Sequence, residues 1–267
     1  MPEKELEYKK TNIFYRISGA GRPVILLHGL PFDGSLWNKQ CEAVPGFKFI
    51  VPDLPGSGHS DRIHDMSITG MAEVIKAIGE AEQISTAAII GHSIGGYVAL
   101  AFAEKYPEHL SGLGLFHSTA YPDTEERRTI RKKGIEFIRK NGAYEFLKTM
   151  IPNLFSPNSK QTAPGLVAGL VDSAKNFSSA TLVSYYEAML ERPDRSSVLK
   201  DANSEILLVA GKYDSAVPLN DSLKQSYLSA VSHFHILFKS AHLGMIEETK
   251  KSNQILMDYL TNLTARE

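Results

Sequence analysis

Short apolar runs alternate with helical patterns through most of the chain, and this alternation limits the fold more than any other feature. The runs end in turn-forming residues, as buried strands do. Buried strands separated by helices predict a mostly parallel sheet that is covered on both faces. The sequence "SGAGR" between the first two runs favours a hairpin there. The predicted strands are 12–17, 23–29, 47–56, 86–93, 111–118, 204–214 and 233–239.

The alternation stops between about residues 121 and 202. This interval has helical patterns, broken by "IPNLFSPNS", "APG" and "RPD", and it contains no convincing strand. We therefore predict a core formed by residues 1–120 and 203–267, with residues 121–202 inserted as a helical cap. Ligands of such sheets bind beyond the carboxyl ends of the strands. Because the insertion follows one of those ends, we expect the cap to lie over the pocket.

Composition excludes several classes of protein. The 267 residues are 43% hydrophobic, which is enough for a large core, and the formal net charge of −1 provides no general attraction for nucleic acid or anionic membranes. Cys41 is the single cysteine, so an intrachain disulfide and a cysteine-rich metal site are both excluded. Its helical surroundings predict a small buried hydrophobic side chain.

The first ten residues, "MPEKELEYKK", have no apolar stretch suited to a signal peptide. No run of about 18 apolar residues follows elsewhere. These features predict a cytoplasmic protein.

The sequence "IGHSIGG" marks the first candidate for chemistry. Ser93 lies between an apolar strand and a helix, with Gly91 and Gly95 two residues away on either side. Gly-x-Ser-x-Gly at a strand-to-helix turn is the nucleophile elbow, in which small residues make room for a strained turn. The pattern alone is weak, and the alternative is a structural turn. Its position between strand and helix makes Ser93 the predicted nucleophile.

A serine hydroxyl needs a base to activate it and an acid to orient that base. His242 is the histidine that comes last in the chain and follows the carboxyl end of a strand. Asp214 follows the preceding strand, so the order serine, aspartate, histidine is that of an elbow enzyme. Alone, Asp214 could be a turn residue and His242 a loop residue. Their order after Ser93 favours a catalytic set.

Acyl transfer also needs donors for a developing oxyanion, and these are usually backbone N–H groups. Ile94 follows the nucleophile at the start of a helix, and Leu30 lies in the loop after "PVILLHG". We expect the N–H groups of Leu30 and Ile94 to form the oxyanion hole. Pro31 cannot donate because it has no N–H group.

Five stretches together resemble the α/β-hydrolase superfamily over residues 10–120 and 204–265. They are "HGLPFDGSLW", "VPDLPGSGHSD", "GHSIGGYVALAFAEKYPEHLSGLGL", "LLVAGKYDSAVP" and "AHLGMIEE". Within it the chain resembles carboxylesterases and lactonases, including the 3-oxoadipate enol-lactonase-like group. The resemblance implies an eight-stranded sheet and the same roles for the residues named above. Serine at position 93 departs from the related dehalogenases and epoxide hydrolases, which have aspartate there, and this argues against both activities.

These features predict a carboxylic ester hydrolase that cleaves small esters or lactones through an acyl-enzyme, with no metal or organic cofactor. Carbon–carbon bond hydrolysis, perhydrolysis, amide cleavage and carrier-protein methyl ester hydrolysis remain possible on the same residues. A non-catalytic ligand-binding protein of this fold is the alternative from another class.

The predicted cap begins with a basic run that contains one acid, Glu136. Such runs are usually a solvated helix face. The alternative is a docking surface for an acidic carrier protein or for a carboxylated substrate, which resembles the use of basic cap residues by pimeloyl-carrier-protein methyl esterases. The basic residues are Arg127, Arg128, Arg131, Lys132, Lys133, Arg139 and Lys140.

Overall fold

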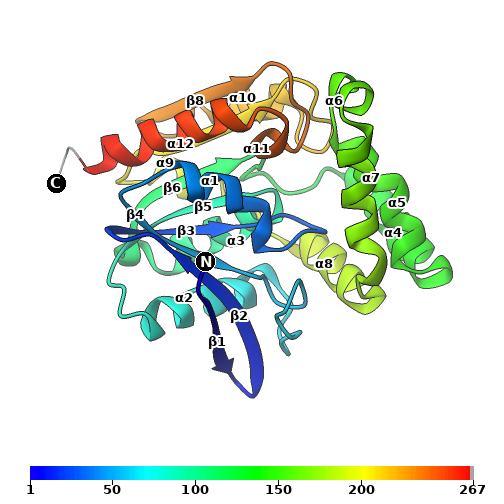
Figure 1. The fold of residues 1–267 in the computed structure, drawn as a ribbon, viewed down its shortest axis with the longest axis horizontal. Coiled ribbons are helices and arrows are strands. Elements are labelled where there is room, and N and C mark those ends of the chain that lie inside the picture. Colours follow the sequence, from blue (N-terminus) through cyan, green and yellow to red (C-terminus); the bar gives the residue numbers. More distant parts are fainter. Residues whose placement is uncertain (265–267) are drawn as a thin grey trace.

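The computed structural model describes residues 1–264, which form one eight-stranded sheet with helices on both sides (Figure 1). The strand order is β1-β2-β4-β3-β5-β6-β7-β8. All pairs from β4 to β8 are parallel, as predicted, and both pairs of β2 are antiparallel. The strands are β1 (Glu3–Tyr8), β2 (Thr11–Ser18), β3 (Arg22–Leu27), β4 (Phe47–Pro52), β5 (Ala87–His92), β6 (Leu110–Phe116), β7 (Ile206–Gly211) and β8 (Ser232–Leu237).

The predicted hairpin between residues 12–17 and 23–29 is wrong. Strand β2 pairs with β1 and β4, not with β3. The glycine-rich link instead lies against the start of β4, where a Cβ on Gly19 would come within 2.3 Å of the Phe47 carbonyl oxygen. The true hairpin joins β1 to β2 through Lys9 and Lys10, which both have positive φ. The polar sequence of β1, "EKELEY", carries no buried apolar run that would predict a strand.

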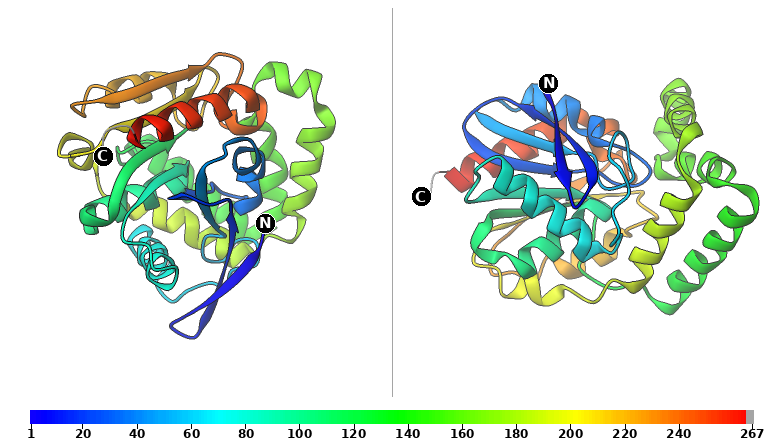
Figure 2. Two further views of the ribbon diagram at one scale, coloured as in Figure 1. Left: turned by 60° about the vertical axis from the view of Figure 1, so that its left-hand side comes forward. Right: turned by 90° about the horizontal axis from the view of Figure 1, so that it is seen from below.

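Helices of the core pack on both faces of the sheet (Figure 2). Helix α12 packs against α1 on one face, and α2 packs against α3 on the other. Cys41 of α1 is buried in the core, as expected, and so is Trp37 at the end of η1. The core helices are η1 (Gly34–Trp37), α1 (Asn38–Ala43), α2 (Ile68–Ala81), α3 (Ile94–Lys105), η2 (Pro107–His109), α10 (Leu219–Gln225), α11 (Gly244–Glu247) and α12 (Thr249–Thr264).

A helical insertion separates β6 from β7 and lies beyond one end of the sheet (Figure 1). It contains no strand among its residues, in agreement with the sequence pattern. The domain boundaries at residues 120 and 203 stay a prediction. The inserted helices are α4 (Glu125–Asn141), α5 (Ala143–Met150), η3 (Ile151–Leu154), α6 (Pro157–Thr162), α7 (Pro164–Ser173), η4 (Ala174–Asn176), α8 (Ser179–Glu191) and α9 (Ser196–Lys200).

Within residues 1–264, none of the helices combines the length and the apolar character that a membrane crossing requires.

Candidate active site

Ser93 occupies a strained turn between β5 and α3. Its φ of 52° and ψ of −119° are rare for a residue with a side chain, and such strain concentrates at functional sites. The flanking glycines are required by close packing: a Cβ on Gly91 would lie 2.2 Å from the backbone of Gly95. A Cβ on Gly95 would lie 2.5 Å from the Leu27 carbonyl oxygen. The local geometry is therefore that of a nucleophile elbow.

The end of β6 holds the backbone of this turn. The Ser93 N–H donates to the Phe116 carbonyl at 3.1 Å, and the Ser118 hydroxyl donates to the Ser93 carbonyl at 2.7 Å. Gln225 Nε2 in turn donates to the Ser118 carbonyl at 2.8 Å. These contacts join segments far apart in the sequence, so the sequence pattern assigned no role to Ser118.

Asp214 and His242 form a buried hydrogen-bonded pair beside this turn. One oxygen of Asp214, Oδ1, accepts the N–H groups of Ala216 and Val217 at 2.8 and 2.9 Å. The other, Oδ2, accepts Nδ1–H of His242 at 2.8 Å. Because a carboxylate only accepts, the proton of neutral His242 lies on Nδ1, and Nε2 has a free lone pair.

The charge state of Asp214 follows from its surroundings. Burial favours the neutral acid, but His242 and His117 oppose this effect and together hold the pKa of Asp214 well below its ordinary value. Asp214 is therefore a carboxylate at neutral pH, suited to orient an imidazole and to stabilise it when protonated.

The inserted helices contact the loop that carries His242. The N–H of His242 donates to the carbonyl of Leu154, in η3, at 2.9 Å. Glu247 bridges the two regions, since its carboxylate accepts the N–H groups of Ala241 and Ser156, both at 2.8 Å. The position of His242 thus depends on the insertion as well as on the sheet.

The two predicted oxyanion donors belong to segments that meet at the elbow, since a Cβ on Gly29 would lie 3.0 Å from the Cβ of Ser93. Ile94 is the first residue of α3, where N–H groups have no partner within the helix. Leu30 lies in the loop after β3, next to Gly29, where a Cβ would come 2.3 Å from the His92 ring. His28 stabilises this loop, because its Nε2 accepts the Leu54 N–H at 2.8 Å. His28 therefore has a structural contact here.

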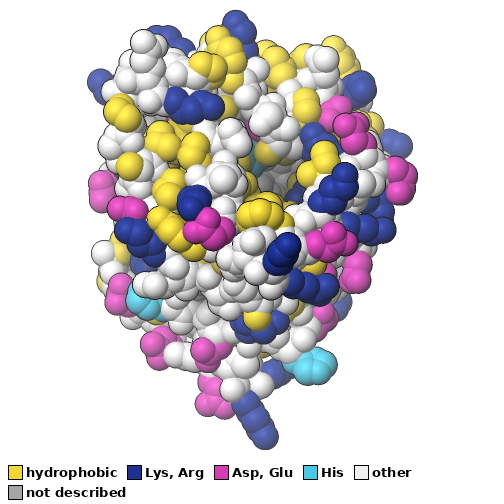
Figure 3. Space-filling view, turned by 90° about the vertical axis from the view of Figure 1, so that its right-hand side faces the viewer, with side chains coloured by type: hydrophobic (Ala, Val, Ile, Leu, Met, Phe, Trp, Pro, Cys, Tyr) yellow, Lys and Arg dark blue, Asp and Glu magenta, His cyan; other side chains and the backbone are white. Residues whose placement is uncertain are grey.

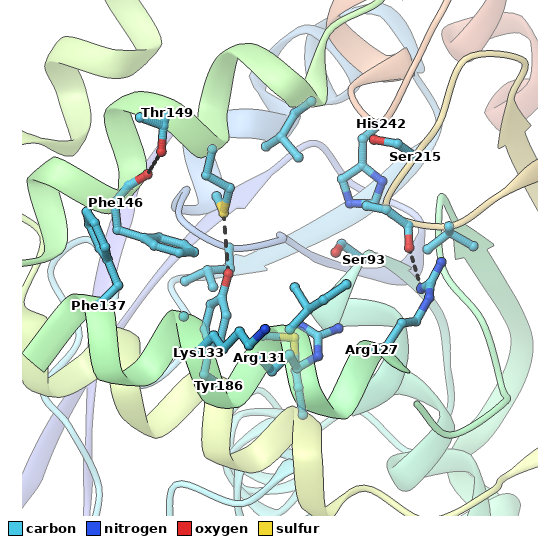
Figure 4. Close-up of a pocket in the computed structure, with 18 of the residues that line it drawn as sticks. Ser93, Arg127, Arg131, Lys133, Phe137, Phe146, Thr149, Tyr186, Ser215 and His242 are labelled. Carbon is cyan, nitrogen blue, oxygen red and sulfur yellow. Dashed lines mark hydrogen bonds between the residues drawn. The ribbon is translucent and has the colours of Figure 1, made fainter. Parts of the chain in front are cut away.

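A cavity of about 540 Å³ opens between the core and the insertion. Ser93, His242 and Leu30 line its inner end, and Figure 4 shows Ser93 and His242 on the same side of it. Within the described residues the Ser93 hydroxyl has no hydrogen bond to His242; such bonds often form only in the complex with substrate. On the surface, the face that carries the insertion is hollowed, with hydrophobic side chains around the hollow (Figure 3).

Three cations of the predicted basic run line the cavity, and no acidic residue of the described chain does. Arg127 donates to the Ala216 carbonyl at 2.6 Å, and Arg131 contacts buried Asp123 at 2.5 Å. Asp123 also pairs with Arg192 at 2.9 Å, so two guanidinium groups share one carboxylate. Lys133 also lines the cavity, although its side chain is exposed (Figure 4). The basic run is therefore only partly a solvated helix face.

One group of side chains has the composition of a metal site. Ligand atoms of His117, Asp214 and His242 lie within 4.8 Å of one another. However, Nδ1 of His242 carries the proton that Asp214 accepts, and both oxygens of Asp214 already accept hydrogen bonds. This bonding suits an orienting pair better than a metal centre.

Comparison with known proteins agrees with this geometry. A family model described as the alpha/beta hydrolase fold matches residues 22–133. A 2-hydroxy-6-oxo-6-phenylhexa-2,4-dienoate hydrolase from Comamonas testosteroni is 28% identical over 93% of this chain and 91% of its own length.

Two solved structures match nearly the whole chain. A thermophilic esterase from Thermogutta terrifontis, solved with malate bound, has a TM-score of 0.90 and 26% identity, covering 98% of this chain and 99% of its own. The enol-lactonase from Burkholderia xenovorans LB400 has a TM-score of 0.89 at 20% identity, covering 97% of this chain and all of its own, which shows the fold alone. The protein is therefore a hydrolase of the α/β-hydrolase fold.

Proposed function

We propose that the protein is a serine hydrolase that cleaves small carboxylic esters or lactones. The observation that carries this proposal is that His242, hydrogen-bonded to buried Asp214, lines the same cavity as a serine on a strained turn. The esterase from Thermogutta terrifontis supports it, because it matches almost the full chain.

The mechanism follows from the protonation states. Nε2 of His242 accepts the hydroxyl proton as Ser93 Oγ attacks the substrate carbonyl carbon. The resulting oxyanion takes hydrogen bonds from the N–H groups of Leu30 and Ile94, each worth about 2.7–4 kcal/mol in the transition state. His242 then protonates the leaving alcohol, and an acyl group stays on Ser93. A water that gives its proton to His242 releases the acid.

The experiment is labelling with a fluorophosphonate, followed by assays with p-nitrophenyl acetate, p-nitrophenyl butyrate and a panel of lactones. Ser93→Ala should lose both labelling and turnover. Ser215→Ala is the matched control, because Ser215 also lines the cavity but lies outside the elbow, and it should keep both. A wild-type protein that neither labels nor turns over any substrate would remove the proposal.

A second candidate is hydrolysis of a carbon–carbon bond next to a ketone, in a substrate that also bears a carboxylate. The cationic lining of the cavity favours an anionic substrate. The Comamonas relative is named for a dienoate, and the Thermogutta esterase was solved with malate, so both names include carboxylates. Turnover of a vinylogous 1,5-diketo acid, with esters and lactones left intact, would favour this candidate.

The carrier-protein proposal rests on the outer face of α4, where Lys132 and Lys140 are exposed. Binding to an acidic carrier protein that weakens with salt and is lost when these charges are reversed would support it. Unchanged binding after the reversal would contradict it.

We also propose that residues 121–202 act as the cap that selects the substrate.

A further inference from the structure

His117 lies behind the proposed catalytic pair and had no role in the sequence predictions. It follows β6 directly, and its side chain is completely buried. Its φ of 50° lies in the left-handed region, which few residues with side chains adopt. Its N–H donates to the Val209 carbonyl at 2.8 Å, which joins the ends of β6 and β7. The backbone is therefore held in an uncommon conformation that directs a buried ring toward Asp214.

The two ring nitrogens of His117 have different partners. Nε2 lies 3.1 Å from the backbone nitrogen of Gly244. A backbone N–H can only donate, so Nε2 must accept, and the ring proton of neutral His117 lies on Nδ1. Nδ1 lies 3.3 Å from Oδ2 of Asp214, the same oxygen that accepts from His242. The protonated nitrogen of His117 thus faces the carboxylate.

Gly244 is matched to this ring. A Cβ at position 244 would lie 2.4 Å from Nε2 of His117, so only glycine fits there. Gly244 is two residues after His242 and begins α11. His117 therefore contacts both the acid and the loop that carries the base.

We propose that His117 is a positioning residue that holds the Asp214 carboxylate and the His242 loop in register for proton transfer. The inference rests on the proposed function. His117 does not line the cavity, so it cannot touch substrate directly. Its Nδ1–H lies 3.3 Å from Asp214 Oδ2 without forming a hydrogen bond, and the N–H dipole partly neutralises the negative charge that holds the proton of His242. Removing the His117 ring should therefore leave more negative charge on Asp214 and stabilise the protonated form of His242.

Other charged or titratable groups also face this cluster. His92 lies at the end of β5, with its ring centroid 4.9 Å from that of His242, and its Nε2 donates to the His242 carbonyl. Glu247 acts on His117 from α11, and Arg127 of α4 lines the same cavity as His242. Burial lowers the pKa of both His92 and His117, which keeps the two rings neutral near pH 7. A shift in the pH profile on changing His117 can then be assigned to the loss of this polar contact with Asp214 and not to a lost charge.

Two variants separate the proposed role from simple packing. In His117→Leu both ring contacts are lost, whereas His117→Asn keeps an amide donor near the Nδ1 position and tolerates positive φ. We expect kcat for p-nitrophenyl butyrate to fall about tenfold or more in His117→Leu, with KM unchanged. The acid limb of kcat/KM should move to higher pH. His117→Asn should restore most of kcat and the wild-type pH profile.

Several outcomes would overturn the inference. They are an unchanged kcat in His117→Leu, or equal losses in both variants with the pH profile unmoved. Nitrogen-15 NMR of the histidines in the wild-type protein tests the same point without depending on the folding of a variant. A proton on Nδ1 of His117 supports the inference, and a proton on Nε2 refutes it. If the wild-type protein had no hydrolase activity, the proposed function would be removed. The tautomer of His117 could still be measured by NMR, so the two failures can be distinguished.

Discussion

Nδ1 of His242 lies 2.8 Å from Oδ2 of Asp214, with at most 4% of either side chain exposed to solvent. The buried carboxylate therefore holds the imidazole in one orientation and one tautomer. The other oxygen, Oδ1, accepts the N–H groups of Ala216 and Val217. Rotation of the carboxylate that exchanged the two oxygens would therefore break these hydrogen bonds.

The first prediction concerns Asp214→Asn. An amide in place of the carboxylate favours the wrong tautomer of His242 and no longer stabilises its protonated form. We expect kcat for p-nitrophenyl butyrate to fall by roughly 10³- to 10⁴-fold, as seen when other serine hydrolases lose this acid. Steady-state kinetics at neutral pH measures the effect. Full activity in the variant would mean that another carboxylate orients His242.

The second prediction concerns the glycines. In Gly95→Ala the new Cβ would meet the carbonyl oxygens of Leu27 and His28 at 2.5 and 2.6 Å, so the variant should lose about 1–3 kcal/mol of unfolding free energy. Gly169→Ala is the control, because Gly169 lies within α7 with no atom near its Cβ position. It should gain about 0.5–1 kcal/mol. Urea denaturation followed by circular dichroism compares the two, and equal stabilities would contradict the expected packing.

The third prediction concerns pH and stability. Burial lowers the pKa of His28, His92 and His117 below the ordinary value of 6.5. Above pH 6.5 these histidines are neutral in both states and have no effect. As pH falls below 6.5 the unfolded chain binds protons that the folded chain excludes, so stability falls, by up to about 1.4 kcal/mol per pH unit for each histidine.

Urea denaturation at pH 7 and at pH 5 tests this trend. The unfolding free energy should be lower at pH 5. The difference should be smaller in His92→Gln, compared with its own stability at pH 7. Equal stability of the wild-type protein at the two pH values would show that these rings become protonated in the folded state.

The fourth prediction concerns the charge of the cavity. Lys133→Glu should lower kcat/KM for the p-nitrophenyl half-ester of glutaric acid by about fivefold to tenfold, with little effect on p-nitrophenyl butyrate. Lys132→Glu is the control, since Lys132 is exposed on the same helix but does not line the cavity. The effect should shrink at high salt. A similar loss for both substrates would indicate damage to the cavity and not a change in charge selection.

Local patterns in the sequence determined the elements that carry the proposed chemistry. The glycines around Ser93 predict the elbow because a strained turn requires small residues at fixed spacing. The apolar runs predict the parallel strands, because strands buried on both faces do not alternate apolar and polar residues. On α4 each cavity-lining residue lies three or four positions from another one, at 127, 130, 131, 133, 134 and 137, so helical periodicity could have marked this face.

The contacts between distant segments could not be predicted from the sequence. The pairing of β1, the path of "SGAGR" against β4, and the contacts of Ser118 and His117 with the site all join residues without a local signal. The turn in "SGAGR" was visible, but the partner of β2 was not, since strand pairing depends on which edges of the sheet are free. His117 shows the same limit: a histidine after a strand has no evident role until the fold brings it 3.3 Å from Asp214. The residue patterns were enough to predict the fold class and the candidate residues of the site, whereas contacts between distant segments place the side chains that surround those residues.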